Sequence, residues 1–466
     1  MIFTIGQVPE SDLYQASSFE LFLDWERAQL EFELDLETTV SPWWCDKQLI
    51  TVQFGSIDGR TQWFLRWLDL TDEQKEHLKH VLENPSKTKL IHNALFEYVI
   101  LRFNNIKLEN VYDTMLAEQV LFGGITSEKG ESLYSLKTLV LKYCCVEMDK
   151  TLQLSFNEEP LSAEQVLYAC DDVMYLSMIR RMQIPELKQE NSENTAALEM
   201  EAVLGYGDMT YNGIELNTHD WLENLKFADP IIESTRKQLE DGLFQDARLY
   251  ARAIELNYLS EQDRVMINWN SANQKRELLS WMCEDLELYT KAYIQKFLKK
   301  STFGDDIDQL LFNMMDGDPL GITQYLISNY RPSLIREGYL IPAGQSTLNW
   351  NSQDQVLPLM KSVEPKLQGL SKEDVDKTSH WILPILQEYK GNLKLKTTYG
   401  EKFIEDNLEP DGKIRTRFNQ IISTGRVSSS QPNMQNIPAK ESVGNRYRNA
   451  FTCPSDWVYV DSDFSG

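Results

Sequence analysis

The pattern of apolar positions separates a strand-rich beginning of the chain from a mostly helical remainder. Residues 29–37 alternate polar and apolar side chains, and residues 49–55 form a second apolar run, which predicts two strands. Residues 72–85 have helical spacing, residues 89–92 form a short strand-like run, and residues 93–180 are mostly helical in pattern. Strands surrounded by helices predict an α/β unit with a mixed central sheet.

A polar stretch at residues 186–194 predicts a domain boundary. Helical patterns dominate after it until the strand-like residues 412–423 and 456–462. We therefore predict three domains, which cover residues 1–190, residues 191–410 and residues 411–466.

Composition narrows the class of protein. A chain of 466 residues with 42% hydrophobic content is long enough for two to four domains with sizeable cores. No run of 18 apolar residues is present, so we expect no membrane segment. The first residues lack a basic segment, so we expect no secretory signal. The six cysteines lack CxxC spacing, which is typical of reduced thiols in a cytoplasmic protein.

Charge is distributed unevenly along the chain. The net charge of −25 argues against a nucleic-acid partner when the whole chain is considered. However, residues 390–448 carry eleven Lys and Arg against six Asp and Glu, a local charge of +5. Because salt screens charges beyond about 8–10 Å, the local balance matters more than the total. This stretch is either a solvated mixed surface or a surface that binds phosphates.

Acidic residues recur in four short stretches of the N-terminal part. These are Asp35-Leu-Glu37, Asn93-Ala-Leu-Phe-Glu97, Tyr112-Asp113 and Tyr168-Ala-Cys-Asp-Asp172. Asp35 and Glu37 are two apart on a predicted strand, so their side chains share a face. Asp172 lies one helical turn after Tyr168. Two divalent ions that cleave a phosphodiester require several converging carboxylates, and such oxygen-rich sites suit Mg²⁺ or Mn²⁺.

The series matters more than any single acidic pair, because Asp285-Leu-Glu287 has the same spacing without supporting stretches. Together the four stretches resemble the exonuclease motifs of the DEDDy group, which polymerase proofreading domains share with RNase D. The resemblance implies a ribonuclease H-like domain with 3′–5′ exonuclease activity and two Mg²⁺ or Mn²⁺ ions. The implied metal ligands are Asp35, Glu37, Glu97 and Asp172.

The resemblance also assigns roles to the neighbouring residues. Tyr168 would orient the attacking water. The group usually has aspartate at the position of Glu97, so Asp113 is a possible substitute ligand, although we expect it to start a helix or to support the ligands. Asn93 is expected to support Glu97 and to contact DNA. We expect His92 to pack or to form a hydrogen bond rather than to bind metal.

Three stretches near the end of the chain resemble the start of the palm in family A (polymerase I-type) DNA polymerases. They are Thr424-Gly-Arg426-Val-Ser-Ser, Pro432-Asn-Met-Gln435-Asn436-Ile-Pro, and Val458-Tyr-Val-Asp-Ser-Asp463. The resemblance implies that Arg426 and Gln435 reach minor-groove acceptors at the primer terminus, which are nearly independent of sequence. Asp463 would coordinate both ions of the nucleotidyl transfer site. The other implied DNA contacts are Asn436, Lys394, Lys396 and Lys440.

These resemblances predict a ribonuclease H-like exonuclease domain, a mostly helical thumb region and the first part of an α+β palm. The second palm aspartate and the triphosphate-binding residues are expected after Gly466. We therefore expect the N-terminal part of a phage-type replicative DNA polymerase, located in the cytoplasm, or in the host cytoplasm if phage-encoded. Its expected partners are primer-template DNA, a single-stranded 3′ end and a C-terminal polymerase fragment, with dNTPs bound only together with that fragment. The alternative is a free-standing 3′–5′ exonuclease with a polymerase-derived DNA-binding module.

One pattern occurs twice in the predicted thumb region. Residues 267–274 and 348–355 share the sequence x-Asn-Trp-Asn-Ser-x-x-Gln. Serine followed three residues later by glutamine predicts a helix start. Family A polymerases carry a similar stretch, normally once, so residues 271–349 are a possible insertion.

Overall fold

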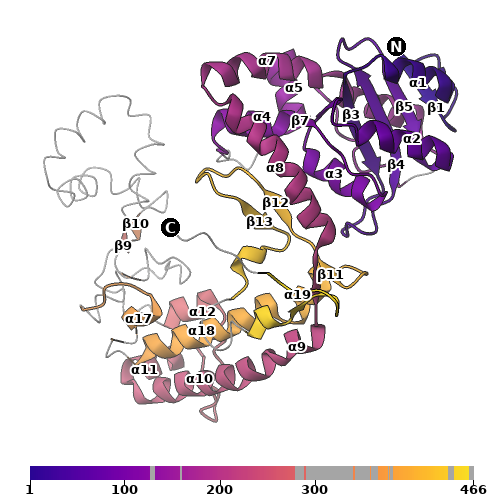
Figure 1. Cartoon of the computed structure of the whole chain (residues 1–466). Coiled ribbons are helices and arrows are strands. Elements are labelled where there is room, and N and C mark those ends of the chain that lie inside the picture. Colours follow the sequence, from indigo (N-terminus) through magenta and orange to yellow (C-terminus); the bar gives the residue numbers. More distant parts are fainter. Residues whose placement is uncertain are drawn as a thin grey trace, which may run out of the picture. The chain divides into compact units, whose positions relative to one another are not determined.

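The fold is described from a computed structural model. It describes residues 1–125, 132–157, 160–278, 366–375, 381–438 and 446–460, together with positions 288–289, 340–341, 357 and 377. The chain forms two compact units (Figure 1). Unit 1 contains Met1–Trp221 and Phe403–Gly466, and unit 2 contains Leu222–Lys402.

A seven-stranded mixed sheet is the centre of unit 1. Its strands are β1 (Ile2–Ile5), β2 (Gln15–Ala16), β3 (Glu31–Thr38), β4 (Leu49–Ser56), β5 (Gln62–Arg66), β6 (Thr88–Ile91) and β7 (Val111–Asp113). They lie in the order β2-β1-β5-β4-β3-β6-β7. The β3-β4 and β4-β5 pairs are antiparallel, whereas β3 pairs with β6 in parallel. The alternating residues 29–37 thus become β3 in the interior of the sheet, and the predicted mixed sheet is confirmed.

Helices cover this sheet. They are α1 (Phe19–Arg27), α2 (Asp72–Leu82), α3 (Ala94–Phe103), α4 (Thr114–Phe122), α5 (Leu136–Cys144), α6 (Ala163–Met174), α7 (Leu176–Gln189) and α8 (Glu193–Asn212), with the 3₁₀ turn η1 (Trp67–Asp69). The start of α2 follows from its sequence, because Thr71 and Gln74 form a reciprocal capping box. Aromatic side chains such as Phe22, Phe32 and Phe54 fill the core between helices and sheet.

The helix after the polar stretch belongs to unit 1. Buried Ala196, Met200 and Val203 of α8 pack into the same core as the sheet. Gly207 allows close packing, since a Cβ there would collide with the Tyr98 ring of α3. The polar stretch therefore marks a break between α7 and α8 rather than the end of the compact unit. The three domains predicted from sequence stay a prediction.

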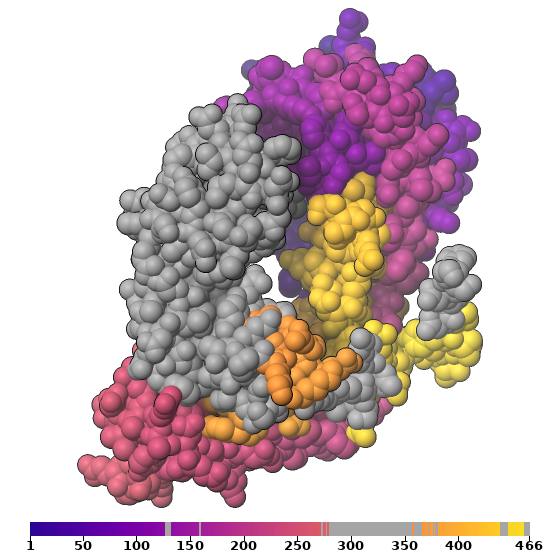
Figure 2. All heavy atoms as spheres, turned by 90° about the vertical axis from the view of Figure 1, so that its left-hand side faces the viewer, coloured from indigo at the N-terminus to yellow at the C-terminus, as the bar shows by residue number. Residues whose placement is uncertain are grey.

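The segment after residue 403 completes unit 1. It contains β11 (Lys413–Ile414), β12 (Arg417–Asn419), β13 (Ser428–Ser430), η3 (Met434–Asn436) and β14 (Phe451–Thr452), and β8 (Ile214–Leu216) pairs with β11 and β14. The β12-β13 hairpin packs beside α8 (Figures 1 and 2). The Gln420 amide donates to the Glu199 carbonyl at 2.8 Å. A Cβ on Gly124, after α4, would lie 2.7 Å from the Ile421 carbonyl oxygen, so glycine permits this approach.

Unit 2 is mostly helical in the part that the structure describes. Its elements are α10 (Leu225–Gln245), α11 (Ala247–Glu255), α12 (Ala272–Leu278), α17 (Lys372–Val375) and α18 (Ile382–Tyr399), with β9 (Leu288–Tyr289) paired to β10 (Leu340–Ile341). Helices α9 (Thr218–Glu223) and α19 (Glu401–Asn407) lie at the two chain crossings between the units. Trp269 and Leu239 are buried in the core of unit 2. Every helix that the structure describes is too short or too polar to cross a membrane.

Two expectations about local structure have different outcomes. The first copy of the repeat starts α12, as predicted, because the Gln274 backbone N–H donates to Ser271 Oγ at 3.2 Å. The Gln274 side chain accepts from the Asn268 N–H instead of the Ser271 N–H. The second copy lies outside the described residues. The strand predicted over 456–462 is wrong for residues 457–460, which are irregular and exposed, with Val460 85% accessible.

Candidate active site

Three carboxylates from two elements meet in unit 1. Asp35 and Glu37 lie on β3, and Asp172 lies in the last turns of α6. One oxygen of each lies within 4.8 Å of the others, and we call these three residues the carboxylate cluster. The β3-β4 register shifts between Glu37 and Thr38. Such a bulge bends a strand and redirects its side chains, a common feature beside active sites.

Glu97 lines the same cavity from the first turn of α3, although it is outside the group that lies within 4.8 Å. Its Oε2 is buried and has no hydrogen-bond partner among the described residues. Asn93 precedes this helix in the left-handed conformation, with φ 73°, which asparagine tolerates better than most residues. The site therefore contains a buried carboxylate oxygen available to a cation.

Asp113 starts a helix rather than facing the cluster as a free ligand. Its Oδ1 accepts from the Met115 and Leu116 N–H groups of α4, at 2.8 and 3.3 Å. It also accepts from the Asn93 N–H at 3.0 Å and the Ala94 N–H at 2.7 Å. One buried carboxylate thus fixes the first turns of both α3 and α4. This confirms the expectation that Asp113 starts a helix.

Burial and mutual repulsion dominate the electrostatics of the cluster. Burial, followed by the charge of Asp172, raises the pKa of Asp35 well above its ordinary value. Burial and the charge of Asp35 do the same to the pKa values of Glu37 and Glu97. Carboxylates buried close together in low dielectric resist ionisation, and a bound cation would offset their repulsion.

Lys150 supplies a positive charge to this site. Its Nζ lies 2.5 Å from Asp172 Oδ1, and both side chains are largely buried. Burial raises the pKa of Asp172, while the charge and hydrogen bond of Lys150 oppose that rise. The same amine lies 5.1 Å from the centre of the Tyr168 ring. Lys150 is in a loop with no motif of its own, so the sequence analysis missed it.

Tyr168 and His92 both line the cavity that contains the carboxylate cluster. Tyr168 shares the cavity with the cluster, and burial together with the Asp172 charge raises its pKa. His92 Nδ1 lies 2.9 Å from Thr114 Oγ1, which confirms the expected hydrogen bond. Burial lowers the pKa of His92 to about 3, so it is neutral at physiological pH.

The residues predicted to act in the polymerase part fall into three groups. Arg426, Gln435 and Asn436 are exposed, and the Gln435 side chain donates to the Val427 carbonyl at 3.1 Å, which holds it beside the turn that carries Arg426. Lys394 and Lys396 lie on α18 in unit 2, where Lys396 pairs with Asp229 at 2.8 Å. Lys440 and Asp463 lie outside the described residues.

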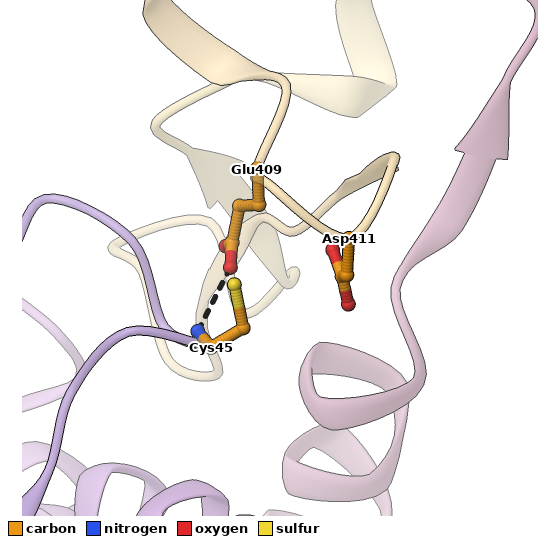
Figure 3. Close-up of side chains that lie close together, drawn as sticks. All are labelled: Cys45, Glu409 and Asp411. Carbon is orange, nitrogen blue, oxygen red and sulfur yellow. Dashed lines mark hydrogen bonds between the residues drawn. The ribbon is translucent and has the colours of Figure 1, made fainter.

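A second acidic group lies elsewhere in unit 1 (Figure 3). Cys45, Glu409 and Asp411 bring their ligand atoms within 4.8 Å of one another, and the Cys45 N–H donates to Glu409. Arg415 pairs with Glu409 at 3.0 Å and with Asp411 at 2.6 Å. We call these four residues the arginine cluster. The positive charge that balances these acids comes from the protein itself, from Arg415.

Two segments of the chain match families of known proteins. Residues 15–184 match the family model of the 3′–5′ exonuclease, and residues 347–466 match DNA polymerase family A. DNA polymerase I of Pseudomonas aeruginosa is 30% identical over 170 residues, which are 33% of this chain and 18% of the relative. The thermostable DNA polymerase I of Thermus aquaticus is 42% identical over 89 residues, 19% of this chain and 11% of the relative.

The chain thus spans less than a fifth of the length of these two relatives. Among solved structures, it resembles the polymerase domain of Pol1 from M. smegmatis in complex with DNA primer-template and dNTP. The TM-score is 0.57 at 20% identity, over 97% of this chain and 59% of that chain, which supports a common fold. The chain therefore contains a 3′–5′ exonuclease domain and part of a polymerase domain of DNA polymerase family A.

Proposed function

We propose that this chain removes nucleotides from the 3′ end of single-stranded DNA, as the proofreading activity of a replicative DNA polymerase. The observation that carries the proposal is the carboxylate cluster within the segment that matches the exonuclease family. Hydrolysis of a phosphodiester in such a site requires divalent ions, which stabilise the attacking and leaving oxygens.

The donor set fits Mg²⁺ or Mn²⁺, because it consists of carboxylates with a buried unpartnered oxygen on Glu97. Asp35, Glu37, Glu97 and Asp172 would hold two ions. Tyr168 would orient the attacking water, and Asn93 would contact the strand. Lys150 would hold Asp172 in place, since it bonds that carboxylate directly.

The test is degradation of a 5′-labelled single strand in Mg²⁺ or Mn²⁺. Asp35→Ala with Glu37→Ala should slow cleavage at least about a thousandfold, roughly 4 kcal/mol of barrier. The matched control is Asp285→Ala with Glu287→Ala, which removes the same spacing of acids outside the motif series. Glu97→Asp should change the rate by less than about tenfold. Equal cleavage by the Asp35/Glu37 variant and the parent would reject the proposal.

For the polymerase part, we propose that residues 347–466 bind primer-template DNA and contribute Asp463 to nucleotidyl transfer. The exposure of Arg426 and Gln435 supports contact with the minor groove. The other proposed DNA contacts are Lys394, Lys396, Asn436 and Lys440. A transfer site with two ions needs a second carboxylate. We propose that C-terminal polymerase sequence supplies it together with the dNTP-binding residues, in a phage-type enzyme of the cytoplasm or the host cytoplasm.

Primer extension tests this part. We expect no incorporation by the 466 residues alone and synthesis after addition of a C-terminal polymerase polypeptide. Template-directed synthesis by the 466 residues alone, abolished by Asp463→Ala, would contradict the proposal that C-terminal polymerase sequence is needed for nucleotidyl transfer.

A further inference from the structure

The cavity that contains the carboxylate cluster also has cations in its wall. It has a volume of about 700 Å³. Asp35 lies in its lining, as do Lys47 from the loop after β3 and Arg417 from β12. Arg417 belongs to the segment that matches the polymerase family rather than the exonuclease family. Both chain segments of unit 1, Met1–Trp221 and Phe403–Gly466, therefore contribute residues to this cavity.

An aromatic support fixes the position of Arg417. Its guanidinium carbon lies 5.9 Å from the centre of the Trp44 ring. Trp44 is buried and packs against Phe96 at 5.8 Å, and Phe96 precedes Glu97 on α3. A guanidinium over an aromatic face is held by a cation–π contact while its N–H groups stay available. The exposed Arg417 is thus tied to the helix that carries an acidic site residue.

Lys47 lies close to Arg417. Burial, and then the charge of Arg417, lower the pKa of Lys47, while Glu409 opposes this change. The Lys47 amine donates to the Ser41 carbonyl. Neither Lys47 nor Arg417 forms an ion pair with a carboxylate in the described part of the chain, and Glu409 is paired with Arg415. Two neighbouring cations that are not ion-paired to a described carboxylate form a site for a negatively charged ligand.

We propose that Lys47 and Arg417 bind backbone phosphates of the single strand whose 3′ end reaches the carboxylate cluster. The inference rests on the proposed exonuclease function and extends it to the upstream nucleotides. The acidic cluster repels phosphates, so a strand in this cavity needs cations along its path. Grooves that bind single strands combine a positively charged path with aromatic side chains, and Asn419 lies with Arg417 in the cavity lining. The polymerase-family segment thereby completes the substrate site of the exonuclease.

The test measures binding of a fluorescent oligothymidylate of four nucleotides at several salt concentrations. All proteins carry Asp35→Ala and Glu37→Ala, which prevents cleavage and removes part of the repulsion. Arg417→Ala should weaken binding about tenfold, because a charged hydrogen bond is lost. Lys47→Ala with Arg417→Ala should make the slope of log K against log salt shallower by about 1.4, since each contact to a single strand contributes about 0.7.

Arg60→Ala is the matched control, because it removes an exposed arginine of unit 1 outside the cavity lining. It should leave both quantities unchanged, and Arg417→Lys should stay within about threefold of the parent. Thermal melting checks each fold, and Lys47→Gln replaces Arg417→Ala if the latter does not fold. Unchanged affinity and salt slope in the Lys47/Arg417 double variant would overturn the inference even if the unsubstituted chain cleaves DNA. Conversely, weaker binding by the Lys47 and Arg417 variants, together with no cleavage by the unsubstituted chain, would support the phosphate site and reject the proposed function.

Discussion

Acidic residues gather in two clusters in the part of unit 1 that the structure describes, and these clusters differ in how their charge is compensated. In the carboxylate cluster, Lys150 pairs with Asp172, and the pKa of Glu37 is raised by burial and by neighbouring acids. In the arginine cluster, burial opposes the change, but hydrogen bonds and charge from Arg415 hold the pKa of Asp411 below its ordinary value. Proximity of acids alone therefore does not identify a metal site.

The two clusters also connect different parts of the molecule. Arg415 donates to the Tyr211 carbonyl at 3.0 Å and lies over the Phe103 ring, so it ties the segment after residue 403 to α3 and α8. Its side chain is 2% exposed. The arginine cluster thus holds two parts of unit 1 together, whereas the carboxylate cluster lines a cavity.

The largest effect should come from breaking the arginine cluster. Arg415→Met leaves Glu409 buried without its cation, and loss of one partner of a buried pair costs about 3–5 kcal/mol. Urea unfolding measures the change, with Arg60→Met as the control for loss of an exposed arginine. A loss below about 1 kcal/mol would show that the cluster does not support the fold.

Next in size is the pH dependence caused by Glu33, a buried acid on β3 that has no proposed metal role. Burial raises its pKa from 4.5 to about 7, although it accepts the Ser177 N–H at 2.8 Å. Because the folded state holds the proton more tightly, this contribution to stability is present below pH 4.5 and lost as the pH rises through about 7.

Glu33→Gln should therefore gain stability relative to the parent between pH 5 and pH 8, by up to about 3 kcal/mol. Unfolding free energies of both proteins at the two pH values measure this difference. A difference that does not change with pH would contradict the raised pKa of Glu33.

A smaller effect, with opposite signs in the two clusters, should follow from neutralising one acid in each. Without divalent ions at pH 8, Glu37→Gln should stabilise the protein by at least about 1 kcal/mol, because it removes a buried repelling charge. Glu409→Gln should destabilise it, because it removes a partner of Arg415. Melting temperatures in chelator measure both, and changes of the same sign would remove the distinction between the clusters.

The smallest effect should be that of Cys45→Ser. The Cys45 backbone N–H donates to Glu409, and the substitution keeps this hydrogen bond. Burial and then Glu409 raise the pKa of the Cys45 thiol to about 11, so it is uncharged at neutral pH. We expect a stability change within about 0.5 kcal/mol. A large loss of stability, or loss of a bound metal, would show that the thiol itself is needed.

Sequence patterns predicted the parts of the site that lie on regular elements. The spacing of Asp35 and Glu37 placed both on one face of β3, and the spacing of Tyr168 and Asp172 placed them on one face of α6. Lys150 and Arg417 were not recognised, because their partners are distant in sequence. Only the folded chain brings Lys150 to Asp172, or Arg417 to Trp44. The strand expected over 456–462 was inferred from apolar residues alone, without knowledge of a partner strand.

Direct counting of bound Mn²⁺ tests the central claim that the carboxylate cluster holds the ions and the arginine cluster does not. Electron paramagnetic resonance can compare the parent with Asp35→Asn plus Glu37→Gln and with Glu409→Gln plus Asp411→Asn. Each double variant replaces one aspartate and one glutamate by the isosteric amides. We predict that the first variant loses the tightly bound Mn²⁺ of the parent and that the second keeps it. Retention of Mn²⁺ by the first variant, or its loss from the second alone, would contradict the account.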